Sequence, residues 1–253
     1  MSKEDRTSFP IHSLFPNIVT MFGLCAGLTS IRFIFSEHWE LAVGCIFVAV
    51  FSDGMDGRIA RMLNSTSNFG AQLDSLADFF NFGVAPAFLL YFWSLRDIKV
   101  FGWALAMTFV ICMAIRLARF NTSLEDKTGA EWQEMFFVGV PAPAGAALLL
   151  LPVILSFYID ISKIFNIRDI AIYAALIAVL VVSHVPTFST KKLHIHRSLA
   201  SLTVALFGVF FACLIARPWI TLSILGTAYF LSIPVSVISY CYIFRKHHKR
   251  LKK

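Results

Sequence analysis

Four aspartates recur at short intervals between positions 53 and 78 of this 253-residue chain. They lie in two pairs, Asp53 with Asp56 and Asp74 with Asp78. Residues three or four apart on a helix share one face, so the members of each pair are expected to project together. Carboxylate ligands without a nearby His or Cys favour a hard cation, Mg²⁺ or Mn²⁺, over zinc. The pattern therefore predicts a site for a divalent cation.

The residues beside the aspartates suit a diphosphate. Gly57 and Gly70 permit close approach of a second backbone or of a ligand, and Ala60 keeps the same face shallow. Arg61, one turn after Asp56, offers a planar donor to phosphate oxygens. The expected chemistry is displacement at phosphorus, in which metal ions neutralise charge and the protein supplies position.

Such a displacement also needs a group that accepts the proton of the attacking hydroxyl. Asp78, the last of the four aspartates, is the predicted base. The structural alternative is a network of ion pairs between the aspartates and Arg58 and Arg61. Four acids against two arginines would leave buried negative charge uncompensated, which argues against a purely structural role.

The elements that position these residues are predicted to be membrane helices. Hydrophobic residues make up 58% of the chain and charged residues 15%, against about 25% charged in soluble domains. A membrane-spanning helix needs about 20 apolar residues. Eight runs approach this length: 17–36, 39–61, 71–94, 98–119, 138–158, 168–185, 198–216 and 219–243. The fold class expected is an all-α, polytopic membrane protein with one membrane domain over residues 1–253.

An even number of spans places both ends of the chain on one side of the membrane. The basic tail 245–253 identifies that side as the cytoplasm, because cytoplasmic segments are enriched in Lys and Arg. Segment 1–15 is polar at its start and leads into Pro10 and Pro16, so we expect a cytoplasmic N-terminal segment and no removable signal peptide. The aspartates then lie at the cytoplasmic face.

The complete pattern resembles the signature of the CDP-alcohol phosphatidyltransferases. It reads Asp53-x-x-Asp56-Gly57-x-x-Ala60-Arg61, eight residues, then Gly70-x-x-x-Asp74-x-x-x-Asp78, without departure at any fixed position. The resemblance implies transfer of a phosphatidyl or similar group from a CDP-linked donor to a hydroxyl, with release of CMP. It also implies that the four aspartates hold the metal, expected as two ions, with Asp78 serving as base.

The resemblance further implies a set of residues that bind the CDP-linked donor. Within the motif these are Asp56, Gly57, Ala60, Arg61 and Gly70. Asn17 and Thr20, one turn apart in the first run, are expected to add polar contacts to the nucleotide. The alternative for Asn17 and Thr20 is an ordinary helix cap.

Five further segments are similar to the CDP-diacylglycerol–serine O-phosphatidyltransferases within this family. They are 15–20, 74–86, 116–121, 139–144 and 186–191. Asn81 stands where that subgroup is expected to have Ser, and Val140 where Leu is commoner. The subgroup implies CDP-diacylglycerol and L-serine as substrates, phosphatidylserine as product, a homodimer, and a multi-pass protein of the bacterial-type cytoplasmic (inner) membrane.

Recognition of serine requires a group that binds its carboxylate. Arg116 and Arg119 lie three residues apart, so they can face one cleft and fork onto a carboxylate, and Asn121 could complete the pocket. In the alternative interpretation these arginines are positive-inside anchors bound to lipid phosphate.

Two other functions fit parts of the pattern. One is the same transfer to glycerol 3-phosphate, inositol or choline. The other is cation transport, which does not need Gly57, Ala60 and Arg61 and places its site near the midplane rather than near one face. The expected partners are CDP-diacylglycerol, L-serine and membrane phospholipids, with no nucleic acid. The net charge of +7 and the basic tail suit an anionic lipid surface.

Overall fold

The computed structural model describes residues 14–251 apart from 64, 66, 124–135 and 189–199. The chain divides into two compact units, residues 1–117 and 118–253, and each is considered by itself. The predicted polar segment 1–15 lies outside the described residues except for positions 14 and 15. The single membrane domain over residues 1–253 stays a prediction.

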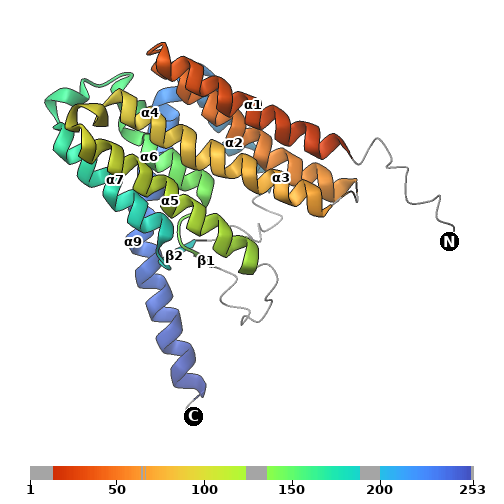
Figure 1. Cartoon of the computed structure of the whole chain (residues 1–253). Coiled ribbons are helices and arrows are strands. Elements are labelled where there is room, and N and C mark those ends of the chain that lie inside the picture. The colour runs from red at the N-terminus through yellow and green to blue at the C-terminus, as the bar shows by residue number, and fades with distance from the viewer. Residues whose placement is uncertain (1–13, 64, 66, 124–135, 189–199, 252–253) are drawn as a thin grey trace. The chain divides into compact units, whose positions relative to one another are not determined.

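The first unit is built from three antiparallel helical rods followed by the start of a fourth. Helix α1 (Phe15–Phe35) and α2 (Trp39–Met62) form a hairpin. The third rod joins α3 (Asn68–Asp78), a π-helical segment (Phe79–Val84) and α4 (Ala85–Trp93), and a 3₁₀ turn (Leu95–Ile98) leads into α5 (Val100–Ser123). Figure 1 shows α1, α2 and the third rod side by side, and α1 packs against both of the others.

Small residues let α1 approach its neighbours closely. Its buried face is Pro16, Thr20, Gly23, Gly27, Ser30 and Ile34. A Cβ on Gly23 would lie 3.0 Å from the Cβ of Ser52 in α2, and one on Gly27 would overlap the side-chain amide of Asn81 in the third rod. Large apolar side chains such as Phe15, Ile18 and Phe22 are exposed. Small residues inside and large apolar residues outside are the pattern of helices packed within lipid.

Aromatic side chains gather at the end of the first unit that is remote from the aspartates. Phe35, at the end of α1, contacts Phe92 in α4, and Trp103 in α5 contacts both Phe88 and Tyr91. Trp and Tyr are enriched at membrane interfaces. We therefore interpret this cluster as an interfacial belt.

The second unit contains a small sheet as well as helices. Strand β1 (Phe136–Val138) pairs antiparallel with β2 (Pro186–Phe188), in the register Phe137 opposite Thr187. The helices are α6 (Ala142–Ser156), α7 (Ile167–Val182), α8 (Ala200–Ala216) and α9 (Pro218–Leu251), with a 3₁₀ turn (Ile161–Lys163) before α7. The predicted helical fold is confirmed, and these two strands are an addition that the sequence analysis did not predict. Each has only three residues, too few for an alternating pattern to be recognised.

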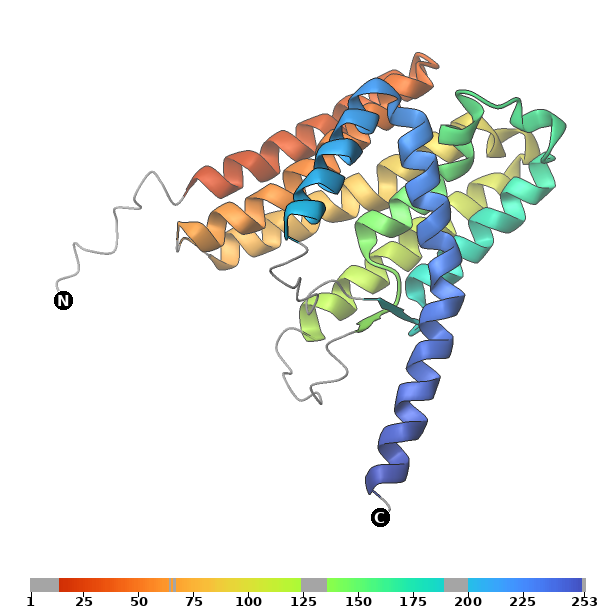
Figure 2. The same ribbon diagram turned by 180° about the vertical axis from the view of Figure 1, so that it is seen from behind.

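A proline in α6 leaves a backbone carbonyl free to accept a hydrogen bond from α7. Pro152 lies inside α6 and has no N–H, so the carbonyl of Leu148 lacks its usual partner four residues on. The hydroxyl of Tyr173, in α7, donates to that carbonyl at 2.7 Å. The Tyr173 ring also contacts Phe230 in α9, the long helix that passes beside β2 (Figure 2).

Each of the eight predicted apolar runs coincides with a helix or helical rod. Within the described part of the chain, four helices are long and apolar enough to cross a membrane: Phe15–Phe35, Asn68–Trp93, Val100–Thr122 and Pro218–Cys241. Helix α2 is equally long but carries the charged motif, and α6, α7 and α8 are shorter. The chain is therefore a helical membrane protein, and the number of eight spans stays a prediction.

Candidate metal centre

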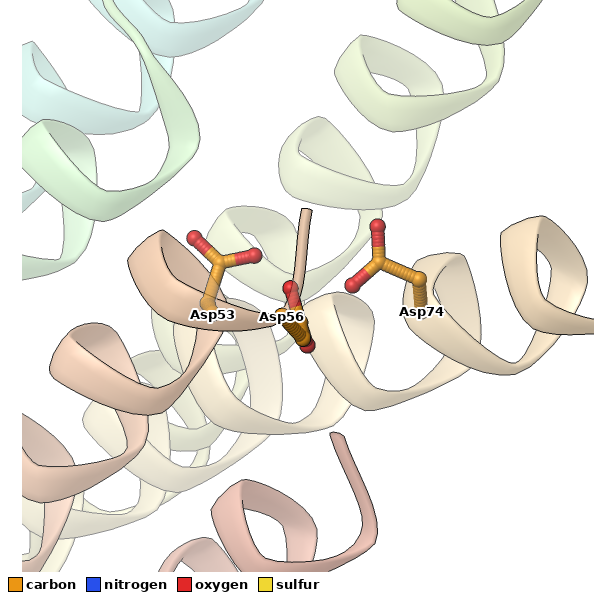
Figure 3. A group of neighbouring side chains, drawn as sticks. All are labelled: Asp53, Asp56 and Asp74. Carbon is orange, nitrogen blue, oxygen red and sulfur yellow. The ribbon is translucent and has the colours of Figure 1, made fainter. Parts of the chain in front are cut away.

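Three of the four aspartates converge where α2 faces α3. Ligand oxygens of Asp53, Asp56 and Asp74 all lie within 4.8 Å of one another. Figure 3 shows Asp53 and Asp56 extending from α2 and Asp74 from the neighbouring α3. Asp56 is buried, and the other two are half-buried. The predicted pairing of Asp53 with Asp56 is therefore present, and Asp74 joins this pair from the second helix.

The turn between α2 and α3 sets this arrangement. Ser67 is the N-cap of α3, and its hydroxyl accepts a hydrogen bond from the Gly70 N–H at 3.0 Å. Such a cap satisfies one of the free N–H groups at a helix start and so defines where the helix begins. Because α3 begins at Asn68, Asp74 faces the last turns of α2.

Asp56 is held from two directions. Its Oδ2 accepts a hydrogen bond from the Thr20 hydroxyl of α1 at 2.7 Å, and its Oδ1 accepts one from the Gly57 N–H at 2.6 Å.

Helix α1 has Leu14 as its N-cap and makes no side-chain capping bond. The alternative that Asn17 and Thr20 cap α1 is therefore wrong.

The donor set suits a hard divalent cation. The buried Oδ1 of Asp74 has no hydrogen-bond partner, and no Lys or Arg among the described residues forms an ion pair with the three carboxylates. Close carboxylates without a counter-charge repel one another, and a cation bound between them would remove the repulsion. All-oxygen ligands favour Mg²⁺ or Mn²⁺.

Asp78 occupies a different position from the other three. It is not a member of the converging group, but its carboxyl group is hydrogen-bonded to that of Asp53. It ends α3, at the point where the π-helical segment begins. Short π-helical segments occur frequently at functional sites. The predicted metal contact of Asp78 and its role as base both stay predictions.

Two glycines of the motif have different surroundings. Among the described residues, a Cβ on Gly57 would meet no atom within 4 Å apart from its own stretch of helix, whereas one on Gly70 would lie 2.8 Å from the amide oxygen of Asn17. Gly57 therefore borders open space, and Gly70 allows α1 to pack against α3. Ala60 is half-buried and Arg61 is exposed at the end of α2.

The predicted serine-binding residues lie in the last turns of α5. Arg116 is half-buried, and Asn121 is exposed. The guanidinium of Arg119 donates to the carbonyl of Val182 at the end of α7 and, through Nη1, to Nε2 of His184 at 3.0 Å. Basic side chains commonly satisfy the last carbonyls of a helix in this way. Arg119 thus has a structural role that its spacing from Arg116 did not predict.

Sequence reasoning missed the residues of α1 that bring the helices together. Gly23 and Gly27 are separated by three residues, a spacing typical of close helix contacts in membranes. This pattern could have predicted the packing of α1. Asn81 is 2% exposed beside Gly27, and its amide oxygen has no partner. No feature of the local sequence identifies the contact between Asn81 and Gly27.

Comparison with known proteins assigns the chain to a family. The family model described as CDP-alcohol phosphatidyltransferase matches residues 13–183, and the one described as CDP-alcohol phosphatidyltransferase 2 matches residues 199–234. The chain belongs to the CDP-alcohol phosphatidyltransferase family, and it is a membrane-embedded transferase.

Individual relatives share one name. A protein of Mycobacterium leprae is 34% identical over 224 residues, covering 88% of this chain and 74% of the relative. One of Helicobacter pylori is 34% identical over 211 residues, covering 83% and 85%. One of Bacillus subtilis is 35% identical over 161 residues, covering 59% and 87%. All three are named CDP-diacylglycerol–serine O-phosphatidyltransferase.

Proposed function

We propose that this protein transfers the phosphatidyl group of CDP-diacylglycerol to the hydroxyl of L-serine, giving phosphatidylserine and CMP. The observation that carries the proposal is the shared name of relatives that match most of the chain at 34% identity. Three converging carboxylates, two on α2 and one on a helix that is long and apolar enough to cross a membrane, agree with it, because such a group suits a metal-bound diphosphate on a lipid donor. Family membership argues against the alternative of cation transport.

The residues of the motif have separate roles in this proposal. Asp53, Asp56 and Asp74 would hold Mg²⁺ or Mn²⁺, and we expect Asp78 to contribute as a fourth ligand. When bound, the metal neutralises charge on the diphosphate. The open space at Gly57 leaves room for the nucleotide, and exposed Arg61 can donate to phosphate oxygens.

Asp78 would take the proton of the serine hydroxyl as it attacks phosphorus. The carboxyls of Asp78 and Asp53 share one proton in a hydrogen bond. A cation bound at Asp53 would displace this proton and leave Asp78 ionised and able to act as base. For the acceptor we retain Arg116 and Asn121 as candidate serine ligands. Arg119 also stays a candidate ligand, since its contacts with Val182 and His184 use only two of the five N–H donors of the guanidinium.

We also infer the orientation in the membrane. Arg58 and Arg61 lie at the aspartate end of α2, and the aromatic belt lies at the opposite end of the first unit. Cytoplasmic ends are rich in arginine and lysine, so the aspartate end belongs on the cytoplasmic side together with both termini. The protein would be a multi-pass protein of a cytoplasmic membrane, assembled as a homodimer.

The test is an acceptor assay with purified protein. Protein and CDP-diacylglycerol are incubated with labelled serine, glycerol 3-phosphate, inositol or choline, with and without chelator. We expect labelled lipid from serine alone, loss of activity with chelator, and recovery with added Mg²⁺ or Mn²⁺. Labelled lipid formed only from another alcohol would identify that alcohol as the acceptor in place of serine. Full activity after metal removal would show that the reaction does not require a metal.

A further inference from the structure

Helix α1 contacts the metal centre through one side chain. Thr20 is 6% exposed, and its hydroxyl lies 2.7 Å from Oδ2 of Asp56 and 3.1 Å from the carbonyl oxygen of Pro16. A hydroxyl has one proton to donate. The carboxylate is the nearer acceptor and, when ionised, the stronger one. The Thr20 proton is therefore directed at Asp56.

We propose that Thr20 is a positioning residue that holds the Asp56 carboxylate in the orientation that binds the divalent cation. This role differs from the nucleotide contact expected from the sequence. It rests on the metal centre of the proposed function but not on the identity of the acceptor alcohol.

The hydrogen bonds of Asp56 explain why such a residue is needed. Oδ2 accepts from Thr20 and Oδ1 from the Gly57 N–H, so rotation of the carboxylate is restrained at both oxygens. Each oxygen has two lone pairs and keeps one for a cation. Asp56 is 4% exposed, so water cannot readily replace a lost donor. Without the Thr20 hydroxyl, repulsion from Asp53 and Asp74 would favour other orientations of Asp56.

The packing of α1 places Thr20 within reach of Asp56. One turn further along, Gly23 approaches Ser52 of α2 so closely that a Cβ would lie 3.0 Å from the Ser52 Cβ. One turn earlier, the Asn17 amide lies against Gly70 of α3. Helix α1 therefore contacts both helices that carry the metal ligands, and only Thr20 among these contacts bonds to a ligand.

The experiment measures Mn²⁺ binding to the purified full-length protein in detergent, without nucleotide or lipid substrate. Thr20→Val removes the hydroxyl and keeps a similar shape, and Thr20→Ser keeps the hydroxyl. Thr29→Val is the matched control, because Thr29 also lies on α1 and donates to the carbonyl four residues before it, Cys25, at 2.7 Å. Titration is followed by the electron paramagnetic resonance signal of free Mn²⁺.

Loss of a partner that orients a metal ligand commonly weakens metal affinity by about 10- to 100-fold. We expect a loss of this size in Thr20→Val, and wild-type affinity within about threefold in Thr20→Ser and Thr29→Val. Unchanged Mn²⁺ affinity in Thr20→Val would overturn the proposal. If Thr20→Val does not fold, Thr20→Ala and Thr20→Ser give the same comparison of a missing and a retained hydroxyl.

A CDP titration separates positioning from direct nucleotide contact. At saturating Mn²⁺, positioning predicts that Thr20→Val binds CDP as the wild type does, because the metal site is then filled. A loss of CDP affinity that persists at every Mn²⁺ concentration would overturn the proposal in favour of direct contact. A wild type inactive with serine but able to bind Mn²⁺ would refute only the acceptor, whereas a wild type unable to bind Mn²⁺ would refute the metal centre and this inference together.

Discussion

At Gly57, which directly follows the buried candidate metal ligand Asp56, an added methyl group would meet no atom of the described residues within 4 Å apart from its own stretch of helix. Packing within the chain therefore does not require glycine there. A ligand that approaches the helix backbone would require it, because any side chain would occupy the ligand's place. The same argument does not apply to Gly70, where Asn17 fills the space.

We predict that Gly57→Ala leaves folding intact and weakens CDP binding by about tenfold or more, equivalent to about 1.4 kcal/mol. Stability should hold because alanine has a higher helix propensity than glycine. The measurements are thermal unfolding and CDP titration at saturating Mn²⁺. Gly44→Ala, on the same helix and also facing open space, is the control and should bind CDP normally. Unaltered CDP affinity in Gly57→Ala would remove this residue from the nucleotide site.

A second residue-scale prediction distinguishes Asp78, which is expected to act as base as well as fourth ligand, from the aspartates of the converging group, which are expected only to bind metal. Asp78→Asn should lower turnover by about 10²- to 10⁴-fold, the usual contribution of a general base, and largely spare CDP binding. Asp53→Asn should weaken both, since Asp53 belongs to the converging group. Turnover with CDP-diacylglycerol and CDP affinity are measured for each variant. Full activity in Asp78→Asn would exclude this residue from the mechanism.

At the scale of elements, a side chain of α7 replaces a backbone hydrogen bond that is missing in α6. Pro152 leaves the Leu148 carbonyl without an intrahelical donor, and Tyr173 of α7 supplies one. An unpaired backbone carbonyl away from water is unfavourable, so this bond specifies how α6 and α7 align. Arg119 acts comparably on the last carbonyl of α7, where the chain turns towards β2.

We predict that Tyr173→Phe lowers the free energy of unfolding by about 1 to 2 kcal/mol, because the Leu148 carbonyl loses its donor. Unfolding in detergent is the measurement, and Tyr158→Phe, at an exposed tyrosine, is the control. In a Pro152→Ala background the helix supplies its own N–H, so Tyr173→Phe should then have a smaller effect. Equal effects in both backgrounds would show that the bond to Leu148 is not the cause.

At the scale of the whole chain, the distribution of residue types matches a lipid environment. Exposed positions carry large apolar side chains, and the buried face of α1 carries small and hydroxyl residues. The helices of the first unit alternate in direction, so the turn after α1 and the turn after α4 lie at the same end. The aspartate site and the turn after α2 lie at the other end.

Reporter fusions test the orientation that follows. Alkaline phosphatase is active only outside the cytoplasm, so we predict activity for a fusion after Asp97 and none for fusions after Leu63 or at the C-terminus. Green fluorescent protein at the C-terminus should fluoresce. An active phosphatase at the C-terminus would indicate an odd number of spans and would place the basic tail outside.

The sequence alone determined the helical character of the membrane segments and the grouping of the aspartates. Both are local properties: a span is a continuous apolar run, and residues three or four apart share a helix face. The positions of the eight apolar runs and the pairing of Asp53 with Asp56 could therefore be predicted without the tertiary structure. The same local evidence identified the family, because its motif lies within 26 consecutive positions, 53–78.

Only the tertiary structure decided what surrounds these residues. Thr20 meets Asp56 across 36 positions of sequence, Tyr173 meets Leu148 across 25, and Arg119 meets Val182 across 63. Contacts between separate helices depend on how the helices cross and rotate, and neither is encoded in the spacing of residues within one helix. The structure also showed that Gly57 borders open space whereas Gly70 packs against Asn17, and it revealed the two short strands. These features too depend on contacts between segments that are distant in the sequence.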